Sequence, residues 1–236
     1  MSASHDPTLS LVIPLYNEAG NVAGVARGLL AAFSAVAVDV ELVLVDNGSA
    51  DDTAAQVDRL AAGDARVVPI HLSPNRGYGG GILAGLNVAR GSVLGYTWGD
   101  NQVRPADHVK VYDRLCEDHL DLCKACRVER HDGLRRKVIT VCYNAAMRLV
   151  FGRIGTRDAN GCPKLMRRAA YEALDLQSKN WFIDPEIILK ARRRKLAVGE
   201  VPVIYHAREQ GRSKVKLATL VEFTVSILRF RLTGRG

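Results

Sequence analysis

The sequence contains no apolar run long enough to cross a membrane and no pattern typical of a secretion signal. A transmembrane helix needs roughly 18 consecutive apolar residues, whereas the closest candidate, residues 217–228, is shorter and contains Glu222. Residues 1–10 are polar, and Pro14 interrupts the apolar segment that follows them. We therefore expect a cytoplasmic protein whose only membrane contact would be peripheral, on the inner face.

Cysteine is also scarce, with five residues in a chain of 236. An odd number of cysteines without a secretion signal predicts free thiols. Cys123 and Cys126 have the spacing of a zinc or redox motif, but no second Cys/His pair at ligand spacing follows them. Because residues 120–128 are typical of a strand, we favour a structural role for this pair over a metal or redox site.

Acidic residues are outnumbered, and the net charge of +8 is concentrated near the end of the chain. Such a field favours an anionic partner, namely nucleic acid, anionic lipid or a phosphorylated substrate, and a solvated basic face explains it equally well. Aromatic residues are sparse in this region and no nucleic-acid motif is present, so we expect no nucleic-acid partner. The basic residues concerned are Arg192, Arg193, Arg194, Lys195, Arg208, Arg212, Lys214, Lys216, Arg229, Arg231 and Arg235.

Apolar segments typical of buried parallel strands alternate with helical segments in the first hundred residues. The expected strands are residues 9–15, 40–45, 67–72 and 93–98, and the expected helices are residues 17–33, 51–62 and a segment ending at residue 89. This order predicts an α/β fold with an open, doubly wound, mostly parallel sheet flanked by helices. Because no repeat or linker is evident, we expect a single domain over residues 1–236.

Polar residues suited to nucleotide binding follow three of the expected strands. They are Tyr16, Asn17 and Glu18 after the first strand, Asp46 and Asn47 after the second, and Asp100 and Gln102 after the fourth. In open α/β sheets ligands bind beyond the carboxyl ends of the strands. The sequence therefore predicts a nucleotide-type site at this edge of the sheet.

Residues 99–102, Gly-Asp-Asn-Gln, place a carboxylate and an amide oxygen together after a strand. A hard divalent cation such as Mg²⁺ or Mn²⁺ accepts one or two protein oxygens and leaves its other positions to water and a diphosphate. Asp100 and Gln102 are therefore the predicted metal ligands, with simple turn formation as the alternative.

The glycine-rich segment 75–81 matches neither the P-loop pattern nor a clean G-x-G-x-x-G. It also follows the third expected strand and not the first. We favour a helix start that packs closely on the sheet over a phosphate cradle.

Taken in order, these motifs resemble the inverting glycosyltransferases of family 2 with the GT-A fold. The nearest subgroup resembles the dolichyl- or polyprenyl-phosphate mannose (or glucose) synthases. The motifs are VIPLYNE at 12–18, VLVDNGS at 43–49, NRGYG at 75–79, GDNQ at 99–102, DANGCPK at 158–164, EVPV at 200–203 and REQGRSK at 208–214. The resemblance implies a nucleotide-sugar-binding half at 9–105, an acceptor-binding half at 106–215 and a C-terminal helix at 216–236.

The resemblance also implies roles at the donor site. Residues expected to bind the donor are Pro14, Tyr16, Glu18, Asp46, Asn47, Asp100, Lys164, Arg208 and Lys214, the last two in a mobile loop over the diphosphate. Asp100 and Gln102 match the second and third ligands of the D-x-D-x-Q metal pattern. The sequence departs from the family at Trp98, which stands at the first acidic position, so metal binding would rely on Asp100, Gln102, the diphosphate and water.

The acceptor residues implied by the resemblance are Arg127, Arg136 and Thr140, which would grip a phosphate through guanidinium forks and a hydroxyl. A solvated amphipathic helix explains Arg136 and Thr140 almost as well. Asp158 and Asp184 fall where a general base would be needed for a hydroxyl acceptor, whereas a phosphate acceptor needs none. The acceptor's identity therefore decides whether Asp158 and Asp184 are catalytic or only positional, and Asp100 is expected to be catalytic through the metal.

The C-terminal segment 216–232 carries an apolar stripe flanked by basic residues, which suits a helix lying on a membrane surface. Packing against the core, or a homodimer contact, is at least as consistent with the pattern. The expected activity is inverting transfer of a hexose from a GDP-mannose or UDP-glucose type donor to a polyprenyl-phosphate-like acceptor. The alternatives are a soluble hydroxyl acceptor on the same fold and a catalytically weak nucleotide-sugar-binding protein.

Overall fold

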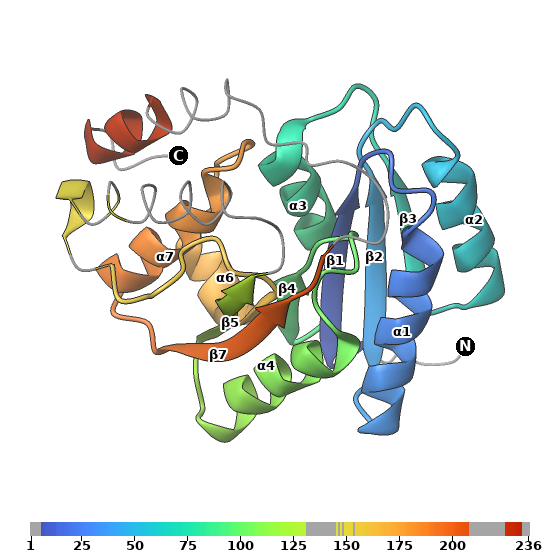
Figure 1. Ribbon diagram of the computed structural model, residues 1–236, viewed down its shortest axis with the longest axis horizontal. Helices are drawn as coiled ribbons and strands as arrows, with labels where there is room; N and C mark the ends of the chain where they lie inside the picture. The colour runs from blue at the N-terminus through green and yellow to red at the C-terminus, as the bar shows by residue number, and fades with distance from the viewer. Residues whose placement is uncertain are drawn as a thin grey trace.

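The computed structural model describes residues 6–130, 145, 147, 149–152, 154–207 and 225–232. A seven-stranded sheet in the order β3-β2-β1-β4-β6-β5-β7 forms its centre, with helices on both faces (Figure 1). The strands are β1 Leu9–Leu15, β2 Val40–Asp46, β3 Val67–His71, β4 Val93–Tyr96, β5 Leu122–Arg130, β6 Lys164–Arg167 and β7 Val198–Tyr205. The labelled helices are α1 Val22–Ala35, α2 Thr53–Gly63, α3 Gly77–Val88, α4 Pro105–Glu117, α6 Arg168–Leu174 and α7 Ile183–Arg193.

The first four strands form the parallel half of the sheet, which confirms the predicted α/β fold. Strand β6 then pairs antiparallel with both β4 and β5, and β7 runs parallel to β5. Because β6 is reversed, the loop that enters it lies at the same edge as the loops that leave β1, β2 and β4. This edge is the one at which the sequence predicts the site.

The core lies on both faces of the sheet. Alternate residues of β2 point to opposite faces, so that Val43 and Val45 belong to the core cluster on the side of α3, while Leu42 and Leu44 belong to the cluster on the side of α1 and α2. All seven residues of β2 are buried, as expected for a strand covered on both faces.

Two predicted boundaries are wrong. The first helix begins at Val22 and not at residue 17, because Asn17 has a φ of 51° in the left-handed region and starts a loop. Strand β4 ends at Tyr96, two residues before the predicted end at Trp98. Both errors lengthen a loop at the edge where the site is expected.

The glycines at the start of α3 allow a close approach of two backbone segments, as the sequence favours. A Cβ atom at Gly79 would lie 2.2 Å from the Ser178 carbonyl oxygen, and Gly80 N–H donates to the Lys179 carbonyl at 2.9 Å. Residues 178–180 thus cover the start of this helix, which supports packing over a phosphate cradle.

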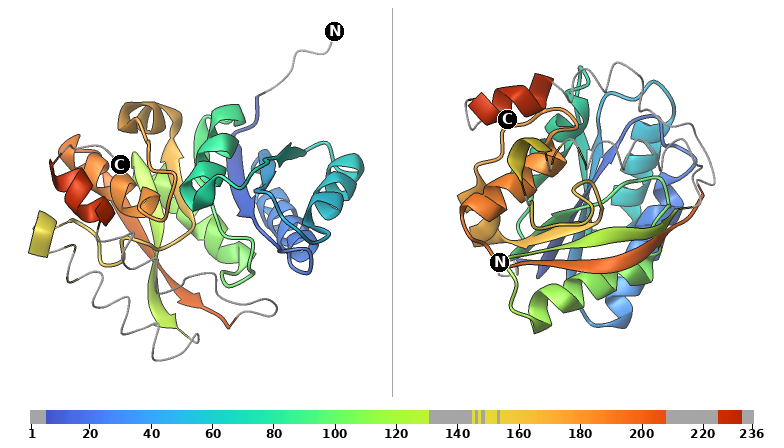
Figure 2. Two further views of the ribbon diagram at one scale, coloured as in Figure 1. Left: turned by 90° about the horizontal axis from the view of Figure 1, so that it is seen from above. Right: turned by 60° about the vertical axis from the view of Figure 1, so that its left-hand side comes forward.

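A C-terminal helix, residues 225–232, packs beside α7 (Figure 2). The Phe230 ring lies 5.4 Å from the Phe182 ring and 5.9 Å from the Phe151 ring, and the Arg193 guanidinium lies 4.6 Å from the centre of the Phe230 ring. The rest of the predicted segment 216–236 lies outside the described residues. Within the part of the chain that the structure describes, no helix is long and apolar enough to cross a membrane.

The four cysteines within the described residues are free, as predicted. They are Cys116, Cys123, Cys126 and Cys162, and Cys142 lies outside those residues. Cys123 and Cys126 are buried in β5, and burial raises the pKa of the Cys123 thiol to about 11. A thiol with so high a pKa stays protonated at neutral pH, and the protonated form is less reactive than the thiolate.

Candidate functional site

The loops that leave β1 and β2 hold each other in place. Asn17 N–H donates to the Ser49 hydroxyl at 2.9 Å, and Ala50 N–H donates to the Asn17 side-chain oxygen at 2.8 Å. Glu18 N–H donates to the Thr53 hydroxyl at 2.9 Å. Tyr16, beside them, is 40% exposed. The two predicted donor-binding loops therefore form one unit at the edge of the sheet.

Asp46 ends β2 and Asn47 follows it, and both are buried in different surroundings. Asp46 Oδ1 accepts from Ser49 N–H at 3.1 Å, and Oδ2 lies 3.7 Å from Nδ1 of His71. The Asn47 amide group donates to the Gly77 carbonyl at 2.8 Å and accepts from Arg76 N–H at 2.9 Å. The Asn47 side chain therefore anchors the start of α3 to the sheet.

The predicted metal ligands lie on a tight turn after β4. Asp100 Oδ1 accepts from Gln102 N–H at 3.3 Å, and both side chains are buried. Gln102 Nε2 donates to the His206 carbonyl at 2.9 Å, and His206 N–H donates to the Gln102 carbonyl at 3.0 Å. The turn is thus tied to the residue that follows β7.

A buried histidine supports the same turn from α4. His108 Nε2 lies 2.8 Å from the Thr97 hydroxyl and Nδ1 lies 3.0 Å from the Arg104 carbonyl. Burial lowers the pKa of His108 to about 4. At neutral pH the ring is uncharged, so Nδ1–H donates to Arg104 and Nε2 accepts from Thr97.

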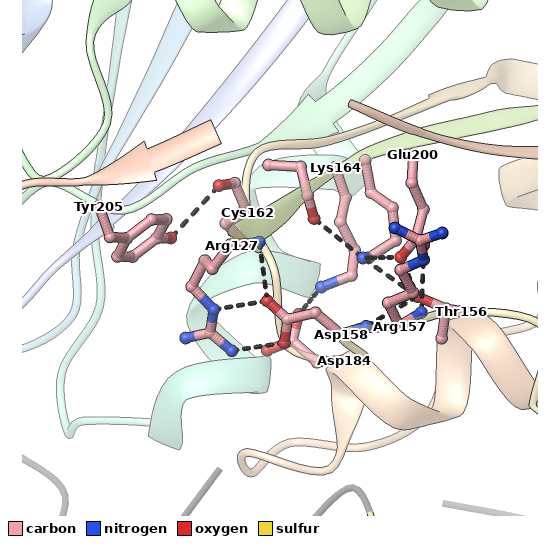
Figure 3. Close-up of polar contacts among 11 residues, drawn as sticks. Arg127, Thr156, Arg157, Asp158, Cys162, Lys164, Asp184, Glu200 and Tyr205 are labelled. Atoms are coloured by element: carbon pink, nitrogen blue, oxygen red, sulfur yellow. Dashed lines mark hydrogen bonds and ion pairs between the residues drawn. The ribbon is translucent and has the colours of Figure 1, made fainter. Parts of the chain in front are cut away.

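Arg127 of β5 and Asp158 form a buried ion pair (Figure 3). Arg127 Nε and Nη2 donate to the two carboxylate oxygens at 2.6 Å each. Burial alone would raise the pKa of Asp158, but the hydrogen bonds and charge of Arg127 outweigh it and hold that pKa well below its usual range. Asp158 is therefore an anion at neutral pH.

Lys164 and Asp184 form a second buried pair. The Lys164 ammonium binds Asp184 Oδ1, which also accepts from the Tyr96 hydroxyl at 2.6 Å. Both side chains are at most 3% exposed, and Lys164 Nζ also lies 5.5 Å from the centre of the Tyr96 ring. The pair joins β6 to the first turn of α7.

A further ion pair, between the buried Lys124 and the partly buried Glu200, was not predicted. Lys124 Nζ donates to Glu200 Oε1 at 2.9 Å, and Glu200 also binds the Thr156 hydroxyl and accepts from Arg157 N–H at 3.1 Å. These contacts fix the loop that presents Asp158 to Arg127. The signal in the sequence was a lysine between apolar residues, in the Leu-Cys-Lys-Ala-Cys run at 122–126, because a buried lysine is nearly always paired.

The structure brings most of the predicted site residues to one edge of the sheet. Arg136, Thr140, Arg208 and Lys214 lie outside the described residues. Among the described residues there is no cluster of three or more His, Cys, Asp or Glu side chains that could hold a metal ion. A cation bound at this edge of the sheet would therefore need ligands other than a cluster of these side chains.

A family model described as "Glycosyl transferase family 2" matches residues 10–175. Among curated proteins, the chain is 30% identical over 217 residues to the glycosyltransferase AglD of Haloferax volcanii, covering 89% of this chain and 34% of that protein. It is 29% identical over 225 residues to the dodecaprenyl-phosphate galacturonate synthase of Rhizobium johnstonii, covering 93% of this chain and 65% of that protein. The chain therefore spans less than two thirds of the length of either relative.

Solved structures show the same fold. The mannosyl-3-phosphoglycerate synthase of Rubrobacter xylanophilus superimposes with a TM-score of 0.75 at 19% identity, covering 97% of this chain and 75% of that one. The glucosyl-3-phosphoglycerate synthase of Mycobacterium tuberculosis, in complex with Mn²⁺, uridine diphosphate and phosphoglyceric acid, gives 0.74 at 17% identity, covering 96% and 79%.

Proposed function

The chain belongs to glycosyl transferase family 2, and from this premise we propose that it transfers a hexose from a nucleotide diphosphate sugar to a polyprenyl phosphate with inversion. The names of two relatives support this acceptor. They are the dodecaprenyl-phosphate galacturonate synthase and the undecaprenyl-phosphate 4-deoxy-4-formamido-L-arabinose transferase of Sodalis glossinidius, to which the chain is 29% identical over 223 residues, covering 93% of this chain and 66% of that protein.

The observation that carries the proposal is that each of the two candidate bases forms an ion pair with a basic side chain, Asp158 with Arg127 and Asp184 with Lys164. A general base works best with a pKa near the working pH, whereas Arg127 helps to hold the pKa of Asp158 well below its usual range. Asp184 is held by Lys164 and by the Tyr96 hydroxyl. A hydroxyl acceptor would need a base, but a phosphate acceptor is already an anion and needs none. The pairing therefore favours a phosphate acceptor.

A divalent cation fits the turn after β4 only as part of a larger ligand set. Asp100 and Gln102 would supply one carboxylate and one amide oxygen, and water and the donor diphosphate would supply the remaining ligands of Mg²⁺ or Mn²⁺. The Gln102 amide nitrogen donates to His206, so its oxygen is the atom suited to the metal. When bound, the cation would neutralise charge on the diphosphate.

In the proposed reaction an oxygen of the acceptor phosphate attacks the anomeric carbon from the face opposite the diphosphate. The new carbon–oxygen bond forms as the bond to the diphosphate breaks, and the nucleoside diphosphate leaves with the electron pair. Arg127 would orient the acceptor phosphate. Pro14, Tyr16, Glu18, Asp46 and Asn47 would bind the donor, and Asn47 also anchors the start of α3. Lys164, Arg208 and Lys214 would contribute positive charge, and Arg136 and Thr140 would complete the phosphate grip.

The C-terminal helix supports contact with an anionic membrane surface. Ile227 and Phe230 face the protein, whereas Val225, Leu228 and Leu232 are 59%, 56% and 85% exposed. These three side chains form one stripe, with exposed arginines at positions 229 and 231. Cosedimentation with phosphatidylglycerol vesicles is the test, and Leu228→Asp should release the protein from them. Equal binding by both proteins would contradict the proposal.

The decisive experiment on the reaction is transfer from GDP-mannose, UDP-glucose and UDP-N-acetylglucosamine, each with Mg²⁺ or Mn²⁺. A short polyprenyl phosphate is supplied in one series and the matching unphosphorylated prenol in the other. Transfer only to the phosphate is the expected result. Transfer to a soluble hydroxyl acceptor without lipid phosphate would contradict the proposal, as would nucleotide binding with no turnover.

A further inference from the structure

Trp98 joins the donor side of the site to its acceptor side. Its indole Nε1–H donates to the Tyr78 hydroxyl at 2.5 Å, and the Tyr78 ring stacks on Trp181 at 4.2 Å. Tyr78 lies in the first turn of α3, beside the nucleotide loops. The indole is therefore fixed in orientation by a hydrogen bond as well as by packing.

The other contacts of Trp98 are with the acceptor side. The Arg127 guanidinium carbon lies 5.8 Å from the centre of the Trp98 ring and 5.3 Å from the centre of the Tyr205 ring. These two rings meet edge to face, at 5.5 Å and 88°. Both distances to Arg127 are within the range of a cation–π interaction. The guanidinium is thus held against a corner made by two aromatic rings.

One edge of this guanidinium is already used. Among the described residues, the acceptors for the Arg127 side chain are the two oxygens of Asp158, which bind Nε and Nη2. Figure 3 shows the third nitrogen pointing away from Asp158. Because a guanidinium has five N–H donors in a planar fork, the edge formed by Nη1 and Nη2 can bind a second oxyanion.

We propose that Trp98 is a positioning residue that holds this outer edge of Arg127 ready for the acceptor phosphate. This inference rests on the proposed function. An aspartate at position 98 would put another carboxylate beside Arg127 and compete for its outer edge. An indole provides an attractive surface for the cation without supplying a competing oxygen. Tryptophan at position 98 therefore cannot bind the metal as an aspartate could, but it makes the phosphate site stronger.

The contact can be observed directly, because Trp98 and Trp181 are the two tryptophans of the chain. In a Trp181→Phe background, fluorescence emission comes from Trp98. Titration with farnesyl phosphate should change this emission saturably, and farnesol at the same concentrations should not. Adding Arg127→Lys, which keeps the charge and removes the fork, should abolish the change. An unchanged emission at concentrations where equilibrium dialysis detects bound farnesyl phosphate would overturn the inference.

Kinetics separate positioning from a general loss of structure. Trp98→Leu, which keeps an apolar side chain without the π face, should raise the KM for the lipid phosphate about tenfold. Trp98→Phe should recover most of that loss, and the KM for the nucleotide sugar should stay within about twofold in both variants. Equal increases in both KM values, or no increase for the lipid phosphate, would contradict the inference.

Trp98→Asp tests whether a carboxylate at position 98 favours the metal at the expense of the phosphate. It should tighten the binding of free Mn²⁺, followed by electron paramagnetic resonance without nucleotide, and weaken the binding of farnesyl phosphate. Unchanged farnesyl phosphate binding in this variant would contradict the inference.

The proposed function can fail separately. If the wild-type protein shows no transfer to any lipid phosphate, the proposed function is wrong. In that case the inference is tested by titrating the protein with inorganic phosphate and following the fluorescence emission of Trp98. An Arg127-dependent change would support it, and no change would overturn it.

Discussion

Arg127 binds Asp158 through both oxygens of the carboxylate, at 2.6 Å each, and neither side chain is more than 7% exposed. Removing one partner of such a pair leaves a buried charge without compensation. Asp158→Asn should therefore lower the free energy of unfolding by about 3 kcal/mol, measured by urea denaturation. The double variant Arg127→Met/Asp158→Leu should lose less than the sum of its two single variants. Additive losses would show that the pair contributes no coupling energy.

Asp100 is expected to be the charged ligand of the metal. Asp100→Asn should lower transfer activity by at least about a hundredfold, and should weaken Mn²⁺ binding in the presence of the nucleoside diphosphate, as followed by electron paramagnetic resonance. Asp107→Asn is the matched control, because that carboxylate pairs with Lys110 on α4 at 2.7 Å. Equal Mn²⁺ binding by the two variants would place the cation elsewhere.

His108 should make stability depend on pH. The unfolded state takes up a proton near pH 6.5, whereas burial lowers the pKa of the folded state to about 4. Stability is therefore lost as the pH falls from about 6.5 to about 4, by about 3 kcal/mol in total. Urea denaturation across this range should show a smaller pH dependence for His108→Gln. His119→Gln, at an exposed position, should behave as the wild type. Identical slopes in all three proteins would rule out the buried neutral imidazole.

The packing of α3 is tested by two glycine substitutions. Gly79→Ala places a Cβ atom 2.2 Å from a backbone oxygen, which cannot move as a side chain would. It should lower the free energy of unfolding by about 2 kcal/mol or more. Gly24→Ala, where nothing lies within 4 Å, should raise it by about 0.5–1 kcal/mol. Similar melting temperatures for the two variants would contradict the close approach.

The parallel half of the sheet followed from the sequence, because strands buried on both faces appear as continuous apolar runs. The meeting of the loops after β1, β2 and β4 at one edge followed from the same parallel order. The reversed strand β6 could not be predicted from the sequence. Its four residues, which include Lys164 and Arg167, are too few to show the alternation of apolar and polar side chains that marks a strand. The pairing of Arg127 with Asp158 joins residues far apart in the sequence, and local patterns carry no information about such contacts. The burial of Lys164 depends in the same way on Asp184 from α7.

The reversed strand also marks the boundary between two blocks of the sheet. In the sheet, β6 is the sole neighbour of β4 on the side of β5 and β7, and the two strands meet over four residue pairs. The loops after β1 and β2 therefore belong to one block of strands and the Arg127–Asp158 pair to another. Under the proposed function, a chimaera that keeps residues 164–167 and replaces the segments that follow β5 would change the acceptor and leave the donor loops unchanged.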